Sequence, residues 1–324
     1  MTEWTFRPGT PADLPAIAEV LAALWPDQVF TVQGLQHGDE QQNASPLPLK
    51  RGRLLAEENG RLSGQRVVGF AEYEQYAGMY HPQKFSVAVN VHPDFQRRGL
   101  GREHAERLWA ELAPYDPVSV LAETQDDRPR GLDFLARQGF TEVIRYFESR
   151  LDVPAFDFAP FAAQEALPAG YLLTSYAELG ETQATQRRLY DLWIELRSDV
   201  PCPEPETPVP FEQFVHRSQD PLYTLPAGYL LAVHGASGEL VGVSELWKSD
   251  GEHLSVGLTA VRREHRRHGL AMGLKLAAIR YARSIGAGEL RTGNASNNVG
   301  MLSINAALGF VQQPAWVEMR RKLR

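Results

Sequence analysis

The chain has 324 residues, which is enough for about two domains of ordinary size. Its composition, with 43% hydrophobic and 23% charged residues, is that of an ordinary soluble globular protein. The 33 lysines and arginines minus the 40 acidic residues give a net charge of −7. This charge argues against nucleic acid as the main partner and mildly favours a cationic partner such as an amine.

Cysteine and histidine usage excludes further classes. Cys202 is the only cysteine, so the sequence holds neither an intramolecular disulfide nor a cysteine metal cluster. The 9 histidines show no persuasive metal-ligand spacing, and we predict no bound metal. The sequence begins without a basic-then-apolar signal segment and has no apolar run of membrane-spanning length. We therefore expect a cytoplasmic protein without a membrane partner.

The first half alternates between strand and helix patterns. Thr10 or Asp13 is suited to cap the first helix, and Asn59-Gly60 is a strong turn signal for a hairpin whose turn extends to Gly64. In order, we predict a strand at 4–7, a helix at 14–24, an irregular segment or poorly periodic helix at 31–50, hairpin strands at 53–58 and 66–73, a strand at 85–91, a helix at 100–112, a strand at 118–122, a short helix at 131–138 and a strand at 143–149.

A basic loop with the sequence QRRGLG lies between the strand at 85–91 and the helix that starts at Leu100. The first turn of a helix carries backbone N–H groups without partners and a partial positive charge, and glycine lets an anion approach the backbone closely. The loop is therefore suited to hold phosphate. It is neither a P-loop nor a dinucleotide fingerprint, because GxxxxGK[ST] and GxGxxG are both absent.

The second half repeats this plan. We predict strands at 171–176, 229–233, 240–246, 254–261, 289–292 and 316–321, and helices at 182–196, 211–217, 270–281 and 301–308. A second basic loop, RRHGLA, precedes the helix at 270. The loop glycines differ by 269 − 99 = 170, and the Gly-Phe pairs that follow the last helices differ by 309 − 139 = 170. The hairpin glycines Gly69 and Gly242 differ by 173. Near-constant offsets over these elements indicate duplication of a whole domain.

The duplication sets the expected domain boundaries. We predict one domain at 1–151, a linker at 152–168 and a second domain at 169–324. Phe156, Phe158 and Phe161 suggest a linker that is pinned to the protein surface. The tandem halves can imitate a dimer of single-domain relatives, so either a monomer or a homodimer is compatible with the sequence.

Both loops resemble the [QR]xxGx[GA] acyl-CoA pyrophosphate loop of the GNAT superfamily of N-acetyltransferases. The resemblance covers nearly the whole chain apart from the linker. It implies an α/β fold of two tandem GNAT domains, each a mixed, partly parallel sheet flanked by helices, in which two central strands splay apart to admit the pantetheine arm of acetyl-CoA. The residues implied to bind the cofactor are Val89, Val91, Gln96, Arg97, Arg98, Gly99, Leu100, Gly101 and Arg102 in the first half, and Thr259, Val261, Arg266, Arg267, His268, Gly269, Leu270, Ala271, Asn294 and Asn298 in the second.

The halves differ before their Gly-Phe pairs. Asn298 matches an asparagine that commonly contacts the cofactor in the family, and Asn305 stands where the family often has a tyrosine that protonates the departing thiolate. Asparagine is not an acid of that kind, although Asn305 can donate a hydrogen bond to the sulfur. The first half has Arg128 and Leu135 at the two positions, so we predict catalysis in the second half. Cofactor binding is compatible with both halves, including an unproductive cofactor in one of them.

Glu245 is the candidate general base for removing a proton from the acceptor amine. It lies three residues after Gly242, as Glu72 lies three after Gly69, so the feature recurs in both halves. The alternative is a solvent-facing or salt-bridged strand carboxylate. His253 and His268 are lesser candidates, and Asp199 and Glu204 either face a cationic acceptor or belong to a proline-rich surface loop.

These features predict an N-acetyltransferase that uses acetyl-CoA and a small-molecule amine, by direct attack of the amine on the thioester. Two alternatives remain open. One is a non-catalytic protein that binds or senses acyl-CoA, because neither half has the family tyrosine. The other is an acetyltransferase that acts on protein N-termini or lysines. The segments at 31–50 and 199–226 are expected to select the acceptor.

Overall fold

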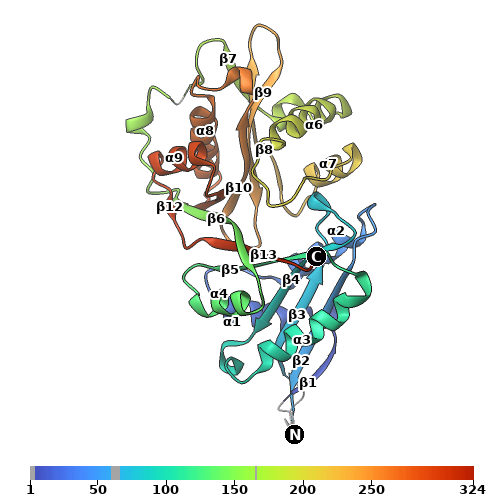
Figure 1. The fold of residues 1–324 in the computed structure, drawn as a ribbon. Coiled ribbons are helices and arrows are strands. Elements are labelled where there is room, and N and C mark those ends of the chain that lie inside the picture. The colour runs from blue at the N-terminus through green and yellow to red at the C-terminus, as the bar shows by residue number, and fades with distance from the viewer. Residues whose placement is uncertain (1–3, 60–65, 165) are drawn as a thin grey trace. The chain divides into compact units, whose positions relative to one another are not determined.

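The computed structural model describes residues 4–59, 66–164 and 166–324 (Figure 1). The chain forms two compact units, which are described separately. The first contains residues 1–144, 204–207 and 317–324, and the second contains 145–203 and 208–316. Within the described ranges, no helix has the length and apolar character that crossing a membrane requires.

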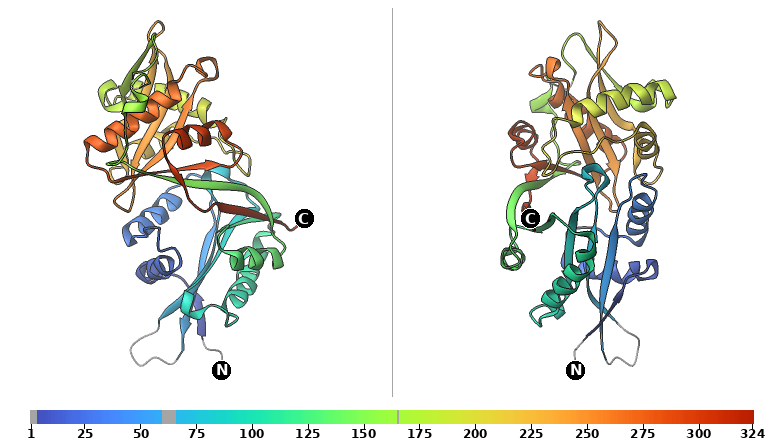
Figure 2. Two further views of the ribbon diagram at one scale, coloured as in Figure 1. Left: turned by 90° about the vertical axis from the view of Figure 1, so that its left-hand side faces the viewer. Right: turned by 45° about the vertical axis from the view of Figure 1, so that its right-hand side comes forward.

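The first unit is a six-stranded sheet in the order β1-β2-β3-β4-β5-β13. Helices α1 and α2 lie on one face of it, and α3 and α4 lie on the other (Figure 2). The strands are β1 (Trp4–Pro8), β2 (Arg51–Glu58), β3 (Val67–Glu74), β4 (Lys84–Val91), β5 (Ser119–Gln125) and β13 (Trp316–Lys322). The helices are α1 (Leu14–Leu24), α2 (Val32–Asn43), α3 (Leu100–Leu112) and α4 (Pro129–Arg137), with 3₁₀ turns at Pro11–Asp13, Ala77–Met79, Pro93–Phe95 and Ala113–Tyr115.

The local sequence accounts for these elements. The Asp13 carboxylate accepts hydrogen bonds from the Thr10 backbone N–H and from the Arg7 guanidinium, which fixes the entry into α1. Thr31 caps α2 by accepting from the Gly34 N–H, so the segment at 31–50 contains the poorly periodic helix that was one of its two predicted forms. The predicted hairpin strands are confirmed as β2 and β3, while the tip of their turn, residues 60–65, lies outside the described residues.

The second unit is a six-stranded sheet in the order β6-β11-β10-β9-β8-β7, with β12 paired to β6. Helices α8 and α9 cover one face, and α6 and α7 cover the other (Figure 1). The strands are β6 (Thr141–Asp152), β7 (Tyr171–Ser175), β8 (Thr224–His234), β9 (Leu240–Lys248), β10 (Leu254–Val261), β11 (Glu289–Ala295) and β12 (Val311–Gln312). The helices are α5 (Tyr176–Leu179), α6 (Gln183–Arg197), α7 (Phe211–Ser218), α8 (Leu270–Ser284) and α9 (Val299–Ala307), with 3₁₀ turns at Ala159–Phe161 and Arg263–His265.

The terminal strands of the two sequence repeats are exchanged between the units. Residues 146–152 of β6, near the end of the first repeat, pair antiparallel with β11 of the second unit. The last strand of the chain, β13, instead lies beside β5 in the first unit, where Val317 and Met319 join the hydrophobic core. The strands expected to close each repeat therefore complete the other compact unit.

The segment expected as a linker packs with the second unit. Phe156 is buried in the hydrophobic core of that unit, and Phe158 and Phe161 pack against the same core. Arg283 also donates hydrogen bonds to the carbonyls of Val153 and Phe156. The phenylalanines therefore hold this segment against the second unit, and Phe156 is buried in its core. The compact second unit accordingly begins at Arg145, before the predicted boundary of the repeat.

A buried histidine distinguishes the first core from the second. His104 on α3 is fully buried, and burial, together with nearby Arg107, lowers its pKa to about 4. Leu274 is its counterpart at the offset of 170, and both side chains approach the hairpin glycine of their own half, Gly69 or Gly242. The first unit thus buries a neutral imidazole where the second buries a leucine.

We expect His104→Leu to make the first unit less sensitive to acid. Between pH 6.5 and about 4 the unfolded chain binds a proton at His104 that the folded chain does not, so stability is lost as the pH falls through this window. The loss is at most about 3 kcal/mol in the free energy of unfolding. Urea unfolding across this pH range measures it, with His216→Gln on α7 as the exposed control. A wild-type curve parallel to that of His104→Leu would contradict the prediction.

Candidate active site

The two basic loops have the same backbone conformation. Arg97 and Arg267 adopt φ values of 67° and 66°, and Gly99 and Gly269 adopt 91° and 81°. Left-handed conformations at alternate positions turn successive backbone N–H groups to one side, which forms an anion-binding concavity. Each loop leads directly into a long helix, α3 or α8, at Leu100 or Leu270. The predicted phosphate cradle therefore lies at a helix start in both units.

The first residue of each motif closes the turn. Gln96 Nε2 donates to the carbonyl of Val91 at 3.1 Å, and Arg266 Nε donates to the carbonyl of Val261 at 2.8 Å. Arg266 also pairs with Asp199, as does Arg263, and these arginines hold the pKa of Asp199 below its usual range. The carboxylate of Asp199 thus faces the loop arginines. Glu204, the other predicted acidic candidate, pairs with Lys84 and Arg320 in the first unit.

Two parallel strands separate beside each loop, as the family resemblance implied. Strands β10 and β11 pair from Leu254↔Leu290 to Val256↔Thr292, and the pairing ends there although both strands continue. In the first unit, β4 and β5 pair only from Lys84↔Ser119 to Ser86↔Leu121. Residues 257–261 of β10 face the opening and are therefore not paired with β11.

A β-bulge is present at the opening of the second unit. On β10, Val256 pairs with Leu246 and Thr259 pairs with Ser244, so three residue steps on β10 match two on β9. The equivalent pairing of β3 with β4 is regular from Gly69↔Val91 to Glu74↔Ser86. Bulges re-aim backbone groups and are frequent beside active sites. The bulge is thus a local difference between the two units.

Glu245 holds the bulge. The carboxylate is 1% exposed and accepts from the Leu258 N–H at 3.2 Å, Trp247 Nε1 at 3.2 Å and the Tyr229 hydroxyl at 3.0 Å. Arg217 approaches the same carboxylate at 3.3 Å. A Cβ atom at Gly257 would come within 2.8 Å of Glu245 Oε2, so the bulge needs a glycine there. Glu72, the counterpart, instead pairs with Arg53 at 2.9 Å.

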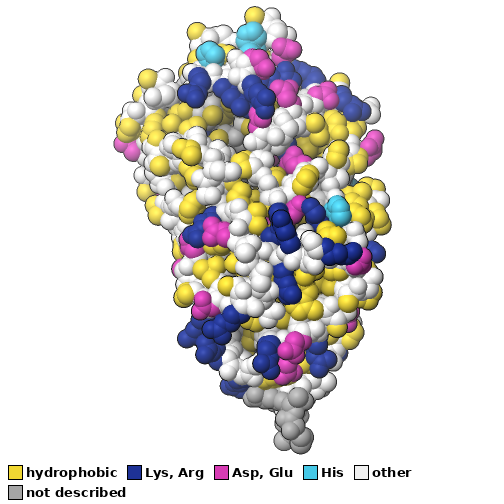
Figure 3. All heavy atoms as spheres, viewed as in Figure 1, with side chains coloured by type: hydrophobic (Ala, Val, Ile, Leu, Met, Phe, Trp, Pro, Cys, Tyr) yellow, Lys and Arg dark blue, Asp and Glu magenta, His cyan; other side chains and the backbone are white. Residues whose placement is uncertain are grey.

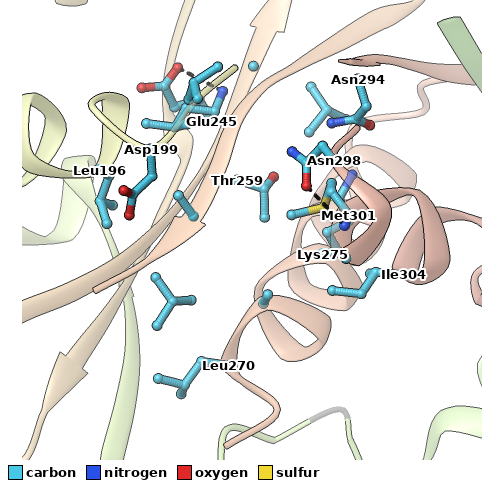
Figure 4. Close-up of a pocket in the computed structure, with 18 of the residues that line it drawn as sticks. Leu196, Asp199, Glu245, Thr259, Leu270, Lys275, Asn294, Asn298, Met301 and Ile304 are labelled. Atoms are coloured by element: carbon cyan, nitrogen blue, oxygen red, sulfur yellow. Dashed lines mark hydrogen bonds between the residues drawn. The ribbon is translucent and has the colours of Figure 1, made fainter. Parts of the chain in front are cut away.

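A cavity of about 1110 Å³ connects these features in the second unit. It is lined by the loop residues Arg266, Arg267, Gly269, Leu270 and Ala271, by residues 256–261 of β10, by α8 and α9, and by Trp193, Leu196 and Arg217 from α6 and α7. The molecular surface is hollowed here, with Lys, Arg and His side chains near one edge (Figure 3). Asp199 and Glu245 lie on one side of β10, and Lys275, Asn298 and Met301 lie on the other (Figure 4). Two substrates that enter from opposite faces of the sheet can therefore meet at the opening.

The asparagines before and within α9 take different positions. Asn298 caps α9 by accepting from the Met301 N–H, and Asn294 and Asn298 both line the cavity. Asn305 is buried, is not among the lining residues, and donates to Asn294 Oδ1 at 2.7 Å. In this structure Asn305 therefore supports the side chain of Asn294. His268 and His253 are also absent from the lining, whereas Thr259 and Val261 belong to it.

The corresponding cavity of the first unit measures about 120 Å³. Val89 lines it, together with Trp25, Trp109, Phe134 and Leu135. Sites for drug-sized ligands usually occupy roughly 300–1000 Å³, so this space is too small for a pantetheine thioester. Arg128 caps α4 and stacks over Trp25 at 3.8 Å. The loop residues Arg97, Arg98, Gly99 and Arg102 are exposed and do not line this small cavity, so the phosphate cradle of this unit is separate from it.

One cavity residue was missed in the sequence. Lys275 on α8 is 2% exposed and lines the large cavity, and burial lowers its pKa to about 7. A lysine in an amphipathic helix ordinarily indicates a solvated face. The available signal was its position between Leu274 and Leu276, in the apolar stripe of the helix, and its replacement by Ala105 in the first half. The described residues contain no cluster of His, Cys, Asp and Glu suited to a metal.

A split sheet with a phosphate-type loop at a helix start, present twice in one chain, defines a tandem acyltransferase fold. A profile of the Acetyltransferase (GNAT) family matches residues 17–140 and 188–310, and the chain belongs to this family of N-acyltransferases. This confirms the resemblance and the fold class inferred from the two loops.

Individual relatives agree with this assignment. An L-amino acid N-acyltransferase, MnaT of Escherichia coli (strain K12), is 34% identical over 136 residues, which are 40% of this chain and 74% of the relative. A GCN5-related N-acetyltransferase from Sphaerobacter thermophilus superposes with a TM-score of 0.73 at 20% identity, covering 100% of this chain and 97% of the other. A tandem GNAT protein from the clavulanic acid biosynthesis pathway gives 0.72 at 24% identity, covering 99% and 98%. The two structures establish similarity of fold alone.

Proposed function

We propose that the second unit transfers an acetyl group from acetyl-CoA to the amine of a small molecule in the cytoplasm. The observation that carries this proposal is the cavity that joins the loop at 266–271 to Glu245 through the opening beside β10. Its volume of about 1110 Å³ suits a pantetheine arm together with a small acceptor. The smaller cavity and regular strand pairing of the first unit support a non-catalytic role for that half.

The residues fit an acyl-CoA. The loop amides at the start of α8 offer donors for a diphosphate, and Arg267 adds positive charge at the cavity edge. The uncovered edge of β10 at 257–261 offers backbone donors for the thioester carbonyl, whose oxygen becomes negative when the amine attacks. The thioester supplies an activated acyl group, so the chain needs to contribute only positioning, proton transfer and charge stabilisation.

Glu245 lies where it can receive a proton from the acceptor. It is the buried anion on the α6–α7 side of β10, and a protonated amine gains a charge-assisted hydrogen bond there. Glu245 takes the proton directly or through one water, and the amine then attacks the thioester. Arg217, which lines the same cavity and is half exposed, offers a cation for an acceptor carboxylate. We therefore propose amino acids as the first acceptor class to test, in line with the activity named for the Escherichia coli relative.

A coupled assay of thiol release from acetyl-CoA tests this function. The acceptor panel should hold amino acids, simple amines and short peptides, and calorimetry should measure CoA binding in parallel. We expect turnover with at least one small amine. CoA binding without turnover on any acceptor would contradict the proposal and favour a sensing protein, and turnover on peptides alone would favour a protein-directed enzyme.

A further inference from the structure

Lys275 is a buried cation for which the structure shows no partner. Among the described residues, no hydrogen-bond acceptor reaches its Nζ atom, and the side chain is 2% exposed. The ring centroid of Phe310 lies 5.0 Å from Nζ. An unpaired buried ammonium is expensive, because water is removed and nothing replaces it. A position that tolerates this cost is a candidate for a function.

The location of Lys275 ties it to the donor side of the cavity. Lys275 lines the cavity from the second turn of α8, about 1.7 turns after the loop glycine Gly269. Figure 4 shows it beside Asn298 and Met301, across from Thr259 on β10. The side chain thus lies between the proposed phosphate cradle and the bulged strand that faces the thioester.

The first unit has the same fold but no lysine at the equivalent position. At the offset of 170, Lys275 corresponds to Ala105, which lines the small cavity of the first unit. Packing of α8 against its sheet therefore does not require a lysine. The unit with the large cavity, the bulge and the asparagine cap is also the one with the buried amine. In that same unit, Asn305 donates to Asn294 and is absent from the cavity lining.

Three of the elements that line the cavity contribute no charged side chain to it. Residues of α9 and β11 that line the cavity are uncharged, as are those of β10. The titratable and charged groups of the lining are Glu245 on β9, Arg217 on α7, Arg197 and Asp199 at the end of α6, and His265, Arg266 and Arg267 in the loop. Desolvation by burial is the cause that lowers the pKa of Lys275 to about 7, so both protonation states are populated near neutral pH.

We propose that Lys275 is the catalytic acid that protonates the sulfur of the departing CoA. This inference rests on the proposed acetyl transfer. As the amine nitrogen forms its bond to the acyl carbon, the carbon–sulfur bond breaks and its electron pair goes to sulfur. The Lys275 ammonium gives its proton to that sulfur, which leaves as a thiol, and the neutral amine regains a proton from water. The acceptor ammonium loses two protons, one before the attack and one after the nitrogen–carbon bond has formed, and both pass through Glu245 to solvent. Because one proton returns to Lys275, the overall reaction releases one proton.

Lys275→Met and Lys275→Ala test the proposal, the second variant copying the first unit. We expect kcat near neutral pH to fall by about 100-fold or more in both variants, because general acids contribute roughly 10²–10⁴-fold. The decline of wild-type kcat as pH rises through about 7, where the ammonium is lost, should disappear in the variants. Ala105→Lys, the reverse exchange in the first unit, is the matched control and should leave kcat unchanged.

A second measurement needs no acceptor and no turnover. The ultraviolet absorbance of thiolate, followed against pH for CoA bound to the full chain, reports the pKa of the bound thiol. A nearby ammonium stabilises thiolate, so this pKa should be lower in the wild type than in either variant. Identical thiol pKa values would overturn the proposal even if acetyl transfer is confirmed. Acetylation of Lys275 itself, detected by mass spectrometry, would also overturn it, because the lysine would then be a nucleophile.

Discussion

Replacing Gly269 with glutamate should reduce kcat/KM for acetyl-CoA by about 100-fold or more, whereas Gly99→Glu should leave it nearly unchanged. A carboxylate at position 269 lies at the start of α8 and repels the diphosphate that the loop is proposed to hold. Loss of hydrogen bonds to a charged group costs about 1.5–3 kcal/mol, and the added repulsion increases this loss. Steady-state kinetics with varied acetyl-CoA, together with calorimetric CoA titration, measures the effect.

The two glycines are suitable controls for each other. Both adopt left-handed conformations, with φ of 81° at Gly269 and 91° at Gly99, and no neighbouring atom crowds a new Cβ at either position. Both substitutions therefore introduce similar backbone strain, about 1–2 kcal/mol. Gly269→Ala adds the strain without the charge and should lose much less activity than Gly269→Glu. Equal losses from Gly269→Glu and Gly99→Glu would contradict the assignment of catalysis to the second unit.

The features that the sequence predicted are those encoded by short motifs and spacing. The glycines at 99 and 269 and the arginines around them specify a turn at a helix start, and the structure has that turn in both units. The near-constant offset, 170 for the loop glycines and for the Gly-Phe pairs, identified the duplication, because it depends only on counting residues. Family membership follows from the same residues and is confirmed.

The exchange of β6 and β13 could not be predicted in this way. A strand pattern states that a segment is extended and which side chains share a face, but it does not choose between two similar sheets. In each sheet, the last parallel strand, β5 or β11, has a second edge that can pair with a further strand. The alternation of apolar residues in β13 therefore fits the core of the first unit as well as it would fit its own repeat.

The differences between the two units at the site, which are the bulge and the cavity size, could not be predicted from the sequence. The pattern at 254–261 predicts a strand without a bulge. Gly257 within it is a signal for the bulge that the structure contains. The size of each cavity depends on several substitutions far apart in sequence, such as Trp109 and Phe134 in the first unit at the positions of Ile279 and Ile304. Single motifs do not carry this information, since it arises from packing.

Glu245→Gln should decrease kcat by about 100-fold or more, because a general base contributes roughly 10²–10⁴-fold and an amide cannot accept the acceptor's proton. The fold should survive. The glutamine carbonyl can accept from the Leu258 N–H and Trp247 Nε1, and the glutamine N–H can donate to the Tyr229 hydroxyl. Circular dichroism and thermal unfolding should therefore show a near-native protein, which separates the chemical role of the carboxylate from its structural one.

Glu72→Gln is the matched control, since Glu72 has the same place after the hairpin glycine but pairs with Arg53 in a unit with regular strand pairing. It should leave turnover unchanged. Glu245→Ala should behave differently from Glu245→Gln, because it leaves buried donors without an acceptor and costs about 3–5 kcal/mol in stability. If Glu245→Gln retained full activity while Glu245→Ala lost it together with stability, the carboxylate would serve only to hold the bulge. Proton removal from the acceptor would then require another group or solvent.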